Sequence, residues 1–294
     1  MKPRKINLDN PNKEWVTSGL NELYRSQVEN DIRNCSQEYE LIRGGGDKYL
    51  ISKQGLIFNN DVLVAMKKYI KDDSIDLIIT SPPYNLGNKH HTGNKKTGCY
   101  SDNMPEDEYQ HWQIEVLNEC YRVLKPHGSL LYNHKNRIKG HSLITPYEWI
   151  FKTNFHRNQE LVWINGSQNF DKCRFFPITE RVYWLTKSKQ TQFFNELKKT
   201  EVFTRKDWKP SGTKQKHTRM FPTAIPLDLI QCFPDSEIVL DPFAGLGTVP
   251  VGAEILGKKW IAIEKNKSFC SSIFSRIEII KEIHDERKSG ESAD

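Results

Sequence analysis

Residues 76–85 read Asp76-Leu77-Ile78-Ile79-Thr80-Ser81-Pro82-Pro83-Tyr84-Asn85, an apolar run that ends at two prolines and a tyrosine. Its apolar half, together with Ile75, predicts a buried strand of a parallel sheet. Proline has no amide hydrogen and disfavours helix in the residue before it, so the chain after Thr80 can neither extend the strand nor begin a helix. We therefore expect a stiff, extended turn at the carboxyl end of the strand, where open α/β sheets bind their ligands.

The expected turn groups three kinds of chemical contact. Ser81 offers a hydroxyl, Pro82 and Pro83 offer carbonyls without a ladder partner, and Tyr84 offers a flat ring. Such a set can accept hydrogen bonds from an amino group while the ring stacks on a planar heterocycle. An ordinary surface loop would have the same sequence features, and that alternative stays open at this point.

Composition bounds the kind of protein. The chain has 294 residues, which suits one large domain or one domain with an inserted module, and 37% of them are hydrophobic. No apolar run approaches the roughly 20 residues that a membrane helix needs, and no secretory signal is present, so we expect a cytoplasmic protein. Six scattered cysteines without a Cys-x-x-Cys pair disfavour structural zinc and disulfides. A net charge of +6 is consistent with a polyanionic partner.

Strands and helices are expected to alternate along much of the chain. Besides the strand before Ser81, we expect strands at 55–58, 129–133, 160–164, 180–185, 237–241 and 259–264, and helices at about 62–70, 105–124 and 248–256. Residues 125–128 (Lys-Pro-His-Gly) are expected to stop the second helix. The alternation indicates a doubly wound α/β sheet.

A second motif lies about 160 residues after the first. Residues 238–248 read Ile-Val-Leu-Asp-Pro-Phe-Ala-Gly-Leu-Gly-Thr, a strand followed by a glycine turn and a helix start. Gly245 and Gly247 permit close backbone approach or a positive φ, and Thr248 can cap the helix. The next strand ends in Glu264, an acid that can accept hydrogen bonds from both hydroxyls of a ribose.

The glycine turn favours a nucleoside cofactor without a pyrophosphate. It holds only Gly-x-Gly, because Pro250 stands at the third glycine position, and no Lys-Ser/Thr pair follows to bind a triphosphate. S-adenosylmethionine is the obvious cofactor of this kind. An ordinary tight turn would use the same two glycines, so the loop alone leaves both interpretations open.

Together these residues resemble the amino-methyltransferases of DNA, in the order in which the catalytic motif precedes the cofactor motif (the β group). The similarity covers about residues 55–280. The segment 80–84, Thr-Ser-Pro-Pro-Tyr, resembles the form typical of N4-cytosine enzymes, whereas N6-adenine enzymes usually carry aspartate where Ser81 stands. Shorter similarities lie at 122–128, 179–184 and 221–226. The last resembles His-Pro-Thr-x-Lys-Pro, with phenylalanine and isoleucine replacing its histidine and lysine.

The resemblance implies a fold and a set of site residues. The fold is the Rossmann-like fold of S-adenosylmethionine-dependent methyltransferases, a doubly wound, mostly parallel sheet with a small DNA-recognition insertion. The catalytic residues are Ser81, Pro82, Pro83 and Tyr84. The cofactor-binding residues are Asp61, Thr223, Asp241, Pro242, Phe243, Gly245, Gly247, Thr248 and Glu264. Among these, Asp61 resembles the acid that contacts the cofactor adenine, and no metal is expected.

The resemblance also divides the chain into five segments. These are an N-terminal extension at 1–52, the catalytic half at 53–186, a target-recognition segment at 187–219, the cofactor-binding half at 220–282 and a polar tail at 283–294. DNA contacts are expected in the recognition segment and in the basic loop at 85–103, mostly to phosphates. The candidates are Lys89, His91, Lys95, Lys96, Arg205, Lys206, Lys209, Lys214 and Lys216. Solvated surface loops are the alternative for both segments.

The implied reaction is methyl transfer from S-adenosylmethionine to the N4 amine of a cytosine in double-stranded DNA. The base must first flip out of the duplex, since its amine is inaccessible inside the stack. We expect Tyr84 to stack on the base while Ser81 Oγ and the Pro82 carbonyl accept the amino hydrogens. A nearby alternative is an N6-adenine enzyme. More distant alternatives are an RNA or small-molecule methyltransferase and a catalytically silent DNA-binding protein.

The resemblance finally implies a biological setting. We expect a prokaryotic, nucleoid-associated enzyme of a restriction–modification system, with a restriction endonuclease as functional partner but without a stable complex. The enzyme is expected to be a monomer or homodimer without membrane contact. An orphan or regulatory methylase would have the same sequence features.

Overall fold

The computed structural model describes residues 48–50, 55–87, 102–166, 173–195, 198–204 and 222–291. The N-terminal extension up to residue 47 and the centres of both basic segments lie outside these ranges. So do all the predicted DNA contacts, namely Lys89, His91, Lys95, Lys96, Arg205, Lys206, Lys209, Lys214 and Lys216. These DNA contacts therefore remain predictions.

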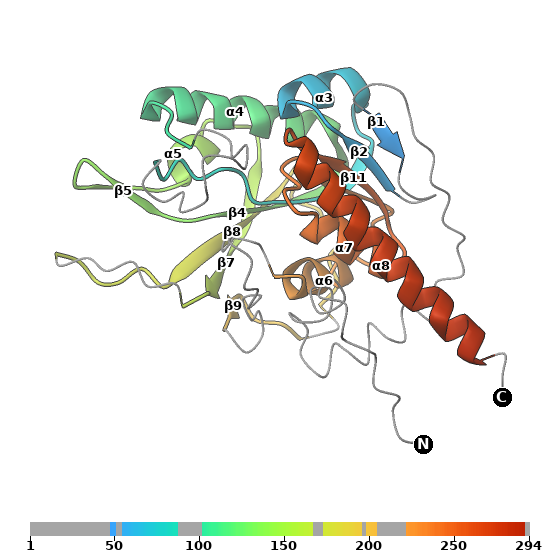
Figure 1. The fold of residues 1–294 in the computed structure, drawn as a ribbon. Coiled ribbons are helices and arrows are strands. Elements are labelled where there is room, and N and C mark those ends of the chain that lie inside the picture. Colours follow the sequence, from blue (N-terminus) through green and yellow to red (C-terminus); the bar gives the residue numbers. More distant parts are fainter. Residues whose placement is uncertain are drawn as a thin grey trace.

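A nine-stranded sheet runs through the described part of the chain (Figure 1). Its strands are β1 (Lys48–Leu50), β2 (Gly55–Phe58), β3 (Ile75–Thr80), β4 (Leu124–His134), β7 (His156–Ile164), β8 (Thr179–Thr186), β9 (Val202–Phe203), β10 (Ile238–Asp241) and β11 (Lys259–Ile263). Their order is β1-β2-β11-β10-β3-β4-β8-β7-β9. The pairings from β2 to β4 are parallel, whereas β4, β8 and β7 pair antiparallel. The predicted mostly parallel sheet is confirmed.

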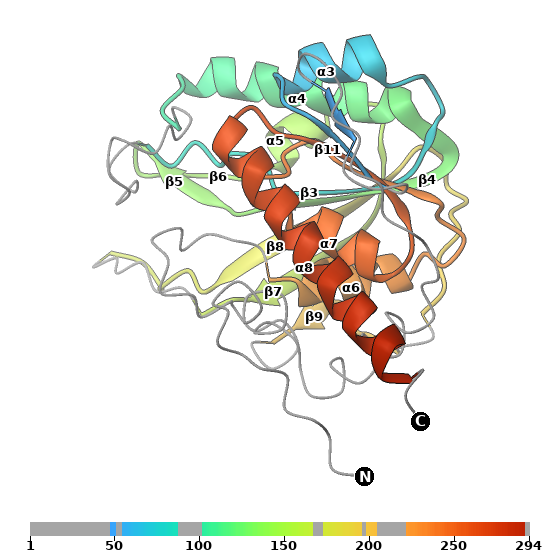
Figure 2. The ribbon, with the colours of Figure 1, turned by 45° about the vertical axis from the view of Figure 1, so that its right-hand side comes forward.

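Helices cover both faces of this sheet (Figure 2). They are α3 (Val62–Tyr69), α4 (Glu106–Val123), α5 (Tyr147–Ile150), α6 (Ala224–Gln231), α7 (Thr248–Ile255) and α8 (Lys267–Glu291). One core lies under α3, α4 and α5, and a second lies under α6, α7 and α8. Side chains of β3 alternate between them, because Leu77 and Ile79 enter the second core and Ile78 the first. The predicted doubly wound arrangement is therefore confirmed.

The sheet order brings the two predicted motifs together. β3, which leads into Ser81, pairs directly with β10, which leads into the glycine loop. Leu77 lies opposite Val239 and Ile78 opposite Leu240, so both strands end at the same edge of the sheet. Residues about 160 positions apart in the sequence thus meet at the carboxyl ends of neighbouring parallel strands.

Two local predictions were wrong. α4 ends at Val123, as the stop signal predicted, but β4 begins at Leu124 rather than at residue 129, so residues 125–128 belong to the strand. The ladder between β3 and β4 shifts register between Ile75 and Leu77, and this irregularity accommodates Pro126, which has no amide to donate. Thr248 does not cap α7, because Gly247 holds the N-cap position with φ +82° and no side chain bonds to the helix start.

Several elements were not predicted. They include the hairpin of β5 (Arg137–Lys139) and β6 (Ser142–Ile144), as well as β1, α5, α6 and β9. α8 continues to Glu291, into the segment expected to be a polar tail. None of the helices in the described ranges combines the length and apolarity that crossing a membrane requires.

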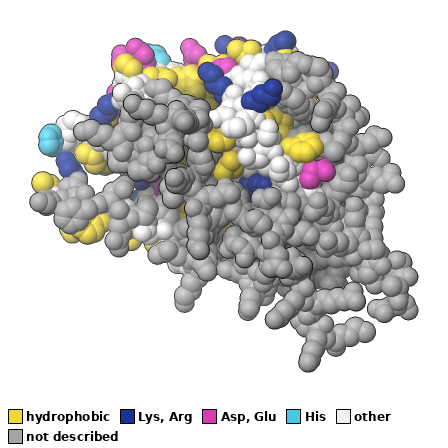
Figure 3. All heavy atoms as spheres, in the orientation of Figure 1, with side chains coloured by type: hydrophobic (Ala, Val, Ile, Leu, Met, Phe, Trp, Pro, Cys, Tyr) yellow, Lys and Arg dark blue, Asp and Glu magenta, His cyan; other side chains and the backbone are white. Residues whose placement is uncertain are grey.

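The surface carries a local concentration of charge at the start of α4. Its first turn holds Glu106, Asp107 and Glu108, and acidic side chains gather at the upper left of Figure 3. Carboxylates there are favourable because the helix dipole places partial positive charge at the N-terminus. One of them, Glu106, also ties α4 to the hairpin beside the catalytic turn, as described below.

Candidate active site

A buried hydrogen bond joins the two motifs. Thr80 Oγ1 donates to Asp241 Oδ1 over 2.8 Å, and the backbone amide of Phe243 donates to the same oxygen over 3.0 Å. Burial raises the pKa of Asp241 to about 7, although these two hydrogen bonds oppose the shift. Thr80, the last residue of β3, is therefore bonded to Asp241, the last residue of β10, at the point where the catalytic turn and the glycine loop begin.

Ser81 and Tyr84 belong to a cluster of polar side chains. Their hydroxyl oxygens lie 2.8 Å apart, and the Tyr84 hydroxyl donates to Glu180 Oε2 over 3.0 Å. Asn133 Nδ2 donates to Ser81 Oγ over 3.2 Å, to Glu180 Oε2 over 3.1 Å and to the Tyr84 hydroxyl. Asn165 Nδ2 donates to Glu180 Oε1 over 2.8 Å. The predicted catalytic turn thus rests on groups from β4, β8 and the residue after β7.

The environment of Tyr84 keeps its hydroxyl neutral. Burial, together with the negative charge of Glu180, places the pKa of Tyr84 well above its ordinary value. Its ring packs on the imidazole of His134 with centroids 4.6 Å apart and planes at 40°. Burial lowers the pKa of His134 to about 3, so this ring is neutral as well. Tyr84 can therefore act as a hydrogen-bond group and a stacking surface, but not as a base.

Sequence reasoning missed Asn133, Glu180 and Asn165. Glu180 lies in the segment 179–184, which resembles the family but to which we assigned no site residue, and Asn133 ends the apolar run of β4. The available signal was a polar residue at the end of an apolar strand. Their meeting depends on the antiparallel pairing of β4 with β8, in which Asn133 lies opposite Val182 and His134 opposite Arg181.

The two proline carbonyls do not have equal roles. The Tyr109 hydroxyl donates to the Pro83 carbonyl over 2.6 Å, so this carbonyl has a side-chain partner. Within the described ranges no donor contacts the Pro82 carbonyl. Of the two acceptors that the sequence offered, Pro82 is therefore the one without a donor in the described part of the chain.

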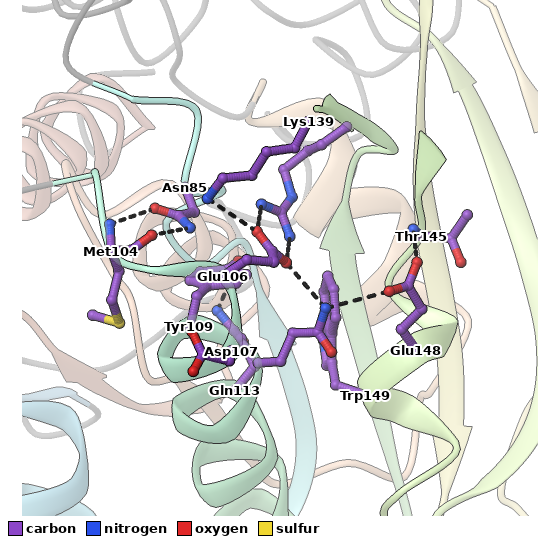
Figure 4. A network of polar contacts seen from close by, with 12 residues as sticks. Asn85, Met104, Glu106, Asp107, Tyr109, Gln113, Lys139, Thr145, Glu148 and Trp149 are labelled. Carbon is purple, nitrogen blue, oxygen red and sulfur yellow. Dashed lines mark hydrogen bonds and ion pairs between the residues drawn. The ribbon is translucent and has the colours of Figure 1, made fainter. Parts of the chain in front are cut away.

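Tyr109 is itself held by charged groups from the hairpin. Arg137 lies over the Tyr109 ring, 4.7 Å from its centroid, and forms two hydrogen bonds of 2.8 Å with Glu106 at the start of α4. Figure 4 shows Glu106 at the centre of this network, with Lys139 approaching from the hairpin. Hydrogen bonds and ring contacts thus connect the hairpin to α4, and Tyr109 of α4 to the Pro83 carbonyl. These contacts hold the catalytic turn in place.

The basic loop begins and ends beside the catalytic turn. The side chain of Asn85 exchanges hydrogen bonds of 2.9 and 2.7 Å with the backbone of Met104 (Figure 4). The carboxylate of Asp102 accepts from the amides of Asn85 and Leu86 over 2.5 and 3.0 Å. These bonds bring the two ends of the segment 88–101 together next to Tyr84.

Glu264, the residue after strand β11, is hydrogen-bonded to the backbone of the glycine loop. Glu264 Oε2 accepts from the Gly245 amide over 2.9 Å, and Oε1 accepts from the Asn266 amide over 2.7 Å. Burial raises the pKa of Glu264. Gly245 has φ +52°, and a Cβ there would meet a single atom within 4 Å, so the loop is open to a ligand at that point. These contacts hold the predicted ribose-binding acid against the predicted cofactor-binding glycine loop.

The remaining predicted cofactor residues surround the same loop. Arg276 of α8 donates to the Leu246 carbonyl over 2.7 Å and approaches Thr248 and Thr223 at 3.5 Å. Asp61 caps α3 by accepting from the Leu63 amide over 3.1 Å. Its other oxygen lies 3.4 Å from Lys265 Nζ, next to Glu264 in the chain.

The carboxylates at this site fit a nucleoside cofactor that carries a positive charge. Two carboxylates, Asp241 and Glu264, flank an open glycine loop, and no Lys-Ser/Thr pair stands there to bind a triphosphate. Among the described residues no group of three His, Cys, Asp or Glu side chains is arranged to hold a metal ion. Carboxylates of this kind can accept hydrogen bonds from the hydroxyls of a ribose and face the positive charge of an ammonium or sulfonium group.

Type II methyltransferases are among the proteins to which this chain is similar in sequence. The chain is 27% identical over 249 residues to the type II methyltransferase M.BglII of Bacillus subtilis, covering 72% of this chain and 66% of that protein. It is 29% identical over 248 residues to M.HpaI of Haemophilus parainfluenzae, covering 76% and 74%.

Two solved structures share the fold. The PvuII DNA methyltransferase, described as cytosine-N4-specific, superposes with a TM-score of 0.62 at 20% identity, over 79% of this chain and 92% of that chain. TTHA0409 of Thermus thermophilus in complex with S-adenosylmethionine gives a TM-score of 0.55 at 17% identity, over 75% and 93%. The family model of the N6 and N4 DNA methylases matches residues 75–275. This protein therefore belongs to the DNA methylase family of amino-methyltransferases, with S-adenosylmethionine as its methyl donor.

Proposed function

We propose that the protein transfers a methyl group to the N4 amine of a cytosine that has flipped out of duplex DNA. The observation that carries this proposal is the Thr80–Asp241 hydrogen bond of 2.8 Å, which ties the turn holding Ser81 to the cofactor loop. Groups that can accept hydrogen bonds from an amine therefore lie beside the methyl-donor site. The base must leave the stack because its amine is inaccessible within the duplex.

Each group of the turn has one role in this reaction. Tyr84 stacks on the flipped base, while Ser81 Oγ and the Pro82 carbonyl accept the two amino hydrogens. These bonds draw the nitrogen toward tetrahedral geometry and expose its lone pair, which is otherwise delocalised in the ring. When bound, S-adenosylmethionine supplies a methyl group activated by a cationic sulfur. The turn contributes by holding the amine in line with that methyl group.

Ser81 favours cytosine N4 over adenine N6. The family resemblance associates serine at this position with N4-cytosine enzymes and aspartate with N6-adenine enzymes. The likeness to PvuII methyltransferase is at the level of fold, so the choice rests on Ser81. Nucleoside analysis of duplex DNA methylated by the protein tests it. N4-methylcytosine supports the proposal, and N6-methyladenine as the sole product overturns it.

The cellular role that we propose is protection of host DNA in a restriction–modification system. Two relatives named as type II methyltransferases support this role. The partner would be an endonuclease that cleaves the same DNA sequence, acting without a stable complex. If plasmid DNA methylated by the protein is cleaved as fast as unmethylated DNA by the endonuclease of a neighbouring gene, this role is excluded.

The affinity for S-adenosylmethionine is expected to depend on pH through Asp241. Burial raises the pKa of Asp241 to about 7, so the fraction that is ionised falls as the pH falls through that value. We propose that the ionised carboxylate faces the cationic part of the cofactor. Lowering the pH from 8 to 6 should then weaken binding about tenfold, because the binding-competent form becomes a minor species. Isothermal titration calorimetry at both pH values measures this.

Asp241→Asn provides the control. Its amide oxygen can still accept from Thr80, but it carries no charge at either pH. We expect weak binding whose remaining pH dependence comes from Glu264, which burial also perturbs, and from the cofactor itself. If wild type and variant lose affinity by the same factor between pH 8 and 6, Asp241 is not the group responsible.

A further inference from the structure

The proposed reaction assigns no role to the carboxylate of Glu180, although this group lies beside Tyr84. Oε2 accepts from the Tyr84 hydroxyl over 3.0 Å and from Asn133 Nδ2 over 3.1 Å, while Oε1 accepts from Asn165 Nδ2 over 2.8 Å. All three donors are neutral groups. A negative charge is thus held by neutral side chains directly behind the residues that face the substrate.

The neighbouring arginine does not neutralise this charge. Arg181 follows Glu180 in β8, and adjacent side chains of a strand point to opposite faces of the sheet. Its guanidinium pairs instead with Glu160 of β7 over 2.9 Å. Among the described residues no Lys, Arg or His forms an ion pair with Glu180. A carboxylate that serves only to stabilise the fold would more commonly have such a partner, so the position of Glu180 points to the active site.

The carboxylate determines the direction of the hydrogen bonds around it. A carboxylate only accepts, so the single hydrogen of the Tyr84 hydroxyl is directed to Glu180. The Tyr84 oxygen can then only accept from Ser81, 2.8 Å away, and the Ser81 hydrogen is directed to Tyr84. Asn133 Nδ2 donates to one lone pair of Ser81 Oγ. One lone pair of Ser81 therefore remains for the amine of the base.

The same charge fixes the orientation of Asn133. Its amide nitrogen lies among three oxygens, those of Ser81, Tyr84 and Glu180. Rotating the amide by 180° would bring its oxygen against the carboxylate, which is repulsive. Glu180 therefore sets both hydrogen bonds of Ser81, because it orients Asn133 directly and the Ser81 hydrogen through Tyr84.

We propose that Glu180 is the positioning residue that makes Ser81 a hydrogen-bond acceptor for the target amine, acting through the Tyr84 hydroxyl. This inference rests on the proposed function. With a neutral amide at position 180, a side-chain nitrogen can donate to Tyr84, and Tyr84 can then donate to Ser81. The Ser81 hydrogen would be free to point at the amine, and two donors would face each other.

A double-mutant cycle of Glu180→Gln and Tyr84→Phe tests the inference. Tyr84→Phe keeps the ring for stacking and removes only the hydroxyl between Glu180 and Ser81. Each single variant should slow single-turnover methyl transfer about 30-fold at saturating DNA and S-adenosylmethionine, the effect of one mispaired buried hydrogen bond. Both changes break the same series of hydrogen bonds, which runs from Glu180 through Tyr84 to Ser81. The double variant should therefore be no slower than the slower single variant. Dissociation constants for DNA and cofactor should stay within threefold of wild type.

Glu160→Gln is the matched control. Glu160 lies on the adjacent strand β7 and accepts from Arg181 and from Tyr147, away from Ser81. The substitution Glu160→Gln removes a carboxylate from the same region of the sheet. It should leave the rate of methyl transfer within twofold of wild type. The contrast between the two Glu→Gln variants separates the role of Glu180 from a general effect of charge.

Two results would overturn the proposal. One is a wild-type rate for either single variant, and Tyr84→Phe gives this answer even if Glu180→Gln does not fold. The other is losses that multiply in the double variant, because Glu180 would then act independently of Tyr84. Both results are rates relative to wild type, and they do not depend on which methylated base is the product. They can therefore reject the role of Glu180 even when N4-methylcytosine is formed. A product other than N4-methylcytosine would instead reject the proposed function.

Discussion

Tyr84→Ala is expected to slow single-turnover methyl transfer about a thousandfold while the affinity for S-adenosylmethionine stays unchanged. The variant loses two contributions at once. Stacking of a base on an aromatic ring contributes about 2 kcal/mol, and the hydroxyl that orients Ser81 contributes about 2 kcal/mol. Their sum of about 4 kcal/mol corresponds to a factor of about a thousand. Rapid-quench assays with labelled cofactor measure the rate.

A matched control separates the catalytic effect from a loss of fold. Tyr147 lies at the start of α5, where its hydroxyl donates to Glu160 over 2.8 Å, outside the Ser81 cluster. Tyr147→Ala should lower stability modestly and leave methyl transfer within threefold of wild type. If Tyr84→Ala transfers methyl groups as fast as Tyr147→Ala, the stacking role of Tyr84 is wrong.

Gly247→Ala is expected to lower the free energy of unfolding by about 3 kcal/mol and to weaken cofactor binding. Gly247 has φ +82°, which costs an L residue about 1–2 kcal/mol. A Cβ there would also lie 2.7 Å from Cγ1 of Ile273 on α8, and crowding of this kind costs about 1–3 kcal/mol. The melting temperature should therefore fall by about 6–12 °C. The displaced loop should also bind S-adenosylmethionine more weakly.

Gly87→Ala is the control for backbone strain. Gly87 has the same φ of +82°, but a Cβ there would meet no atom within 4 Å. This variant should lose only about 1–2 kcal/mol, from the left-handed backbone alone. Differential scanning calorimetry of both variants measures the difference. Equal losses would show that the contact between Gly247 and α8 contributes nothing.

Local sequence signals predicted the centre of the fold well. β3, β10 and β11 are short apolar runs that end at proline, glycine or acid residues, and both the run and its end are encoded within about ten residues. The same signals placed Ser81 and Asp241 at strand ends. The hydrogen bond between Thr80 and Asp241 could not be predicted from local patterns, since it depends on β3 and β10 pairing across about 160 residues.

The errors came from signals that tertiary structure overrides. Pro126 normally ends regular structure, yet it lies within β4 because the register shift beside Ile75 removes the need for its amide. Thr248 has a good capping side chain, but the left-handed Gly247 takes the N-cap position instead. Asn133 and Glu180 could not be predicted as members of the cluster around Ser81 and Tyr84, because only the pairing of β4 with β8 brings them together.

The turn at Ser81 is proposed to hold the amine of a flipped cytosine in line with the methyl group. The single-turnover rate of Ser81→Ala, measured together with the identity of the methylated nucleoside, tests this role directly. We predict that wild type forms N4-methylcytosine. Ser81→Ala should bind DNA and S-adenosylmethionine with wild-type affinity but form the same product about 100-fold more slowly, as when one positioned catalytic hydrogen bond is lost. Formation of N4-methylcytosine by Ser81→Ala at the wild-type rate would contradict the account.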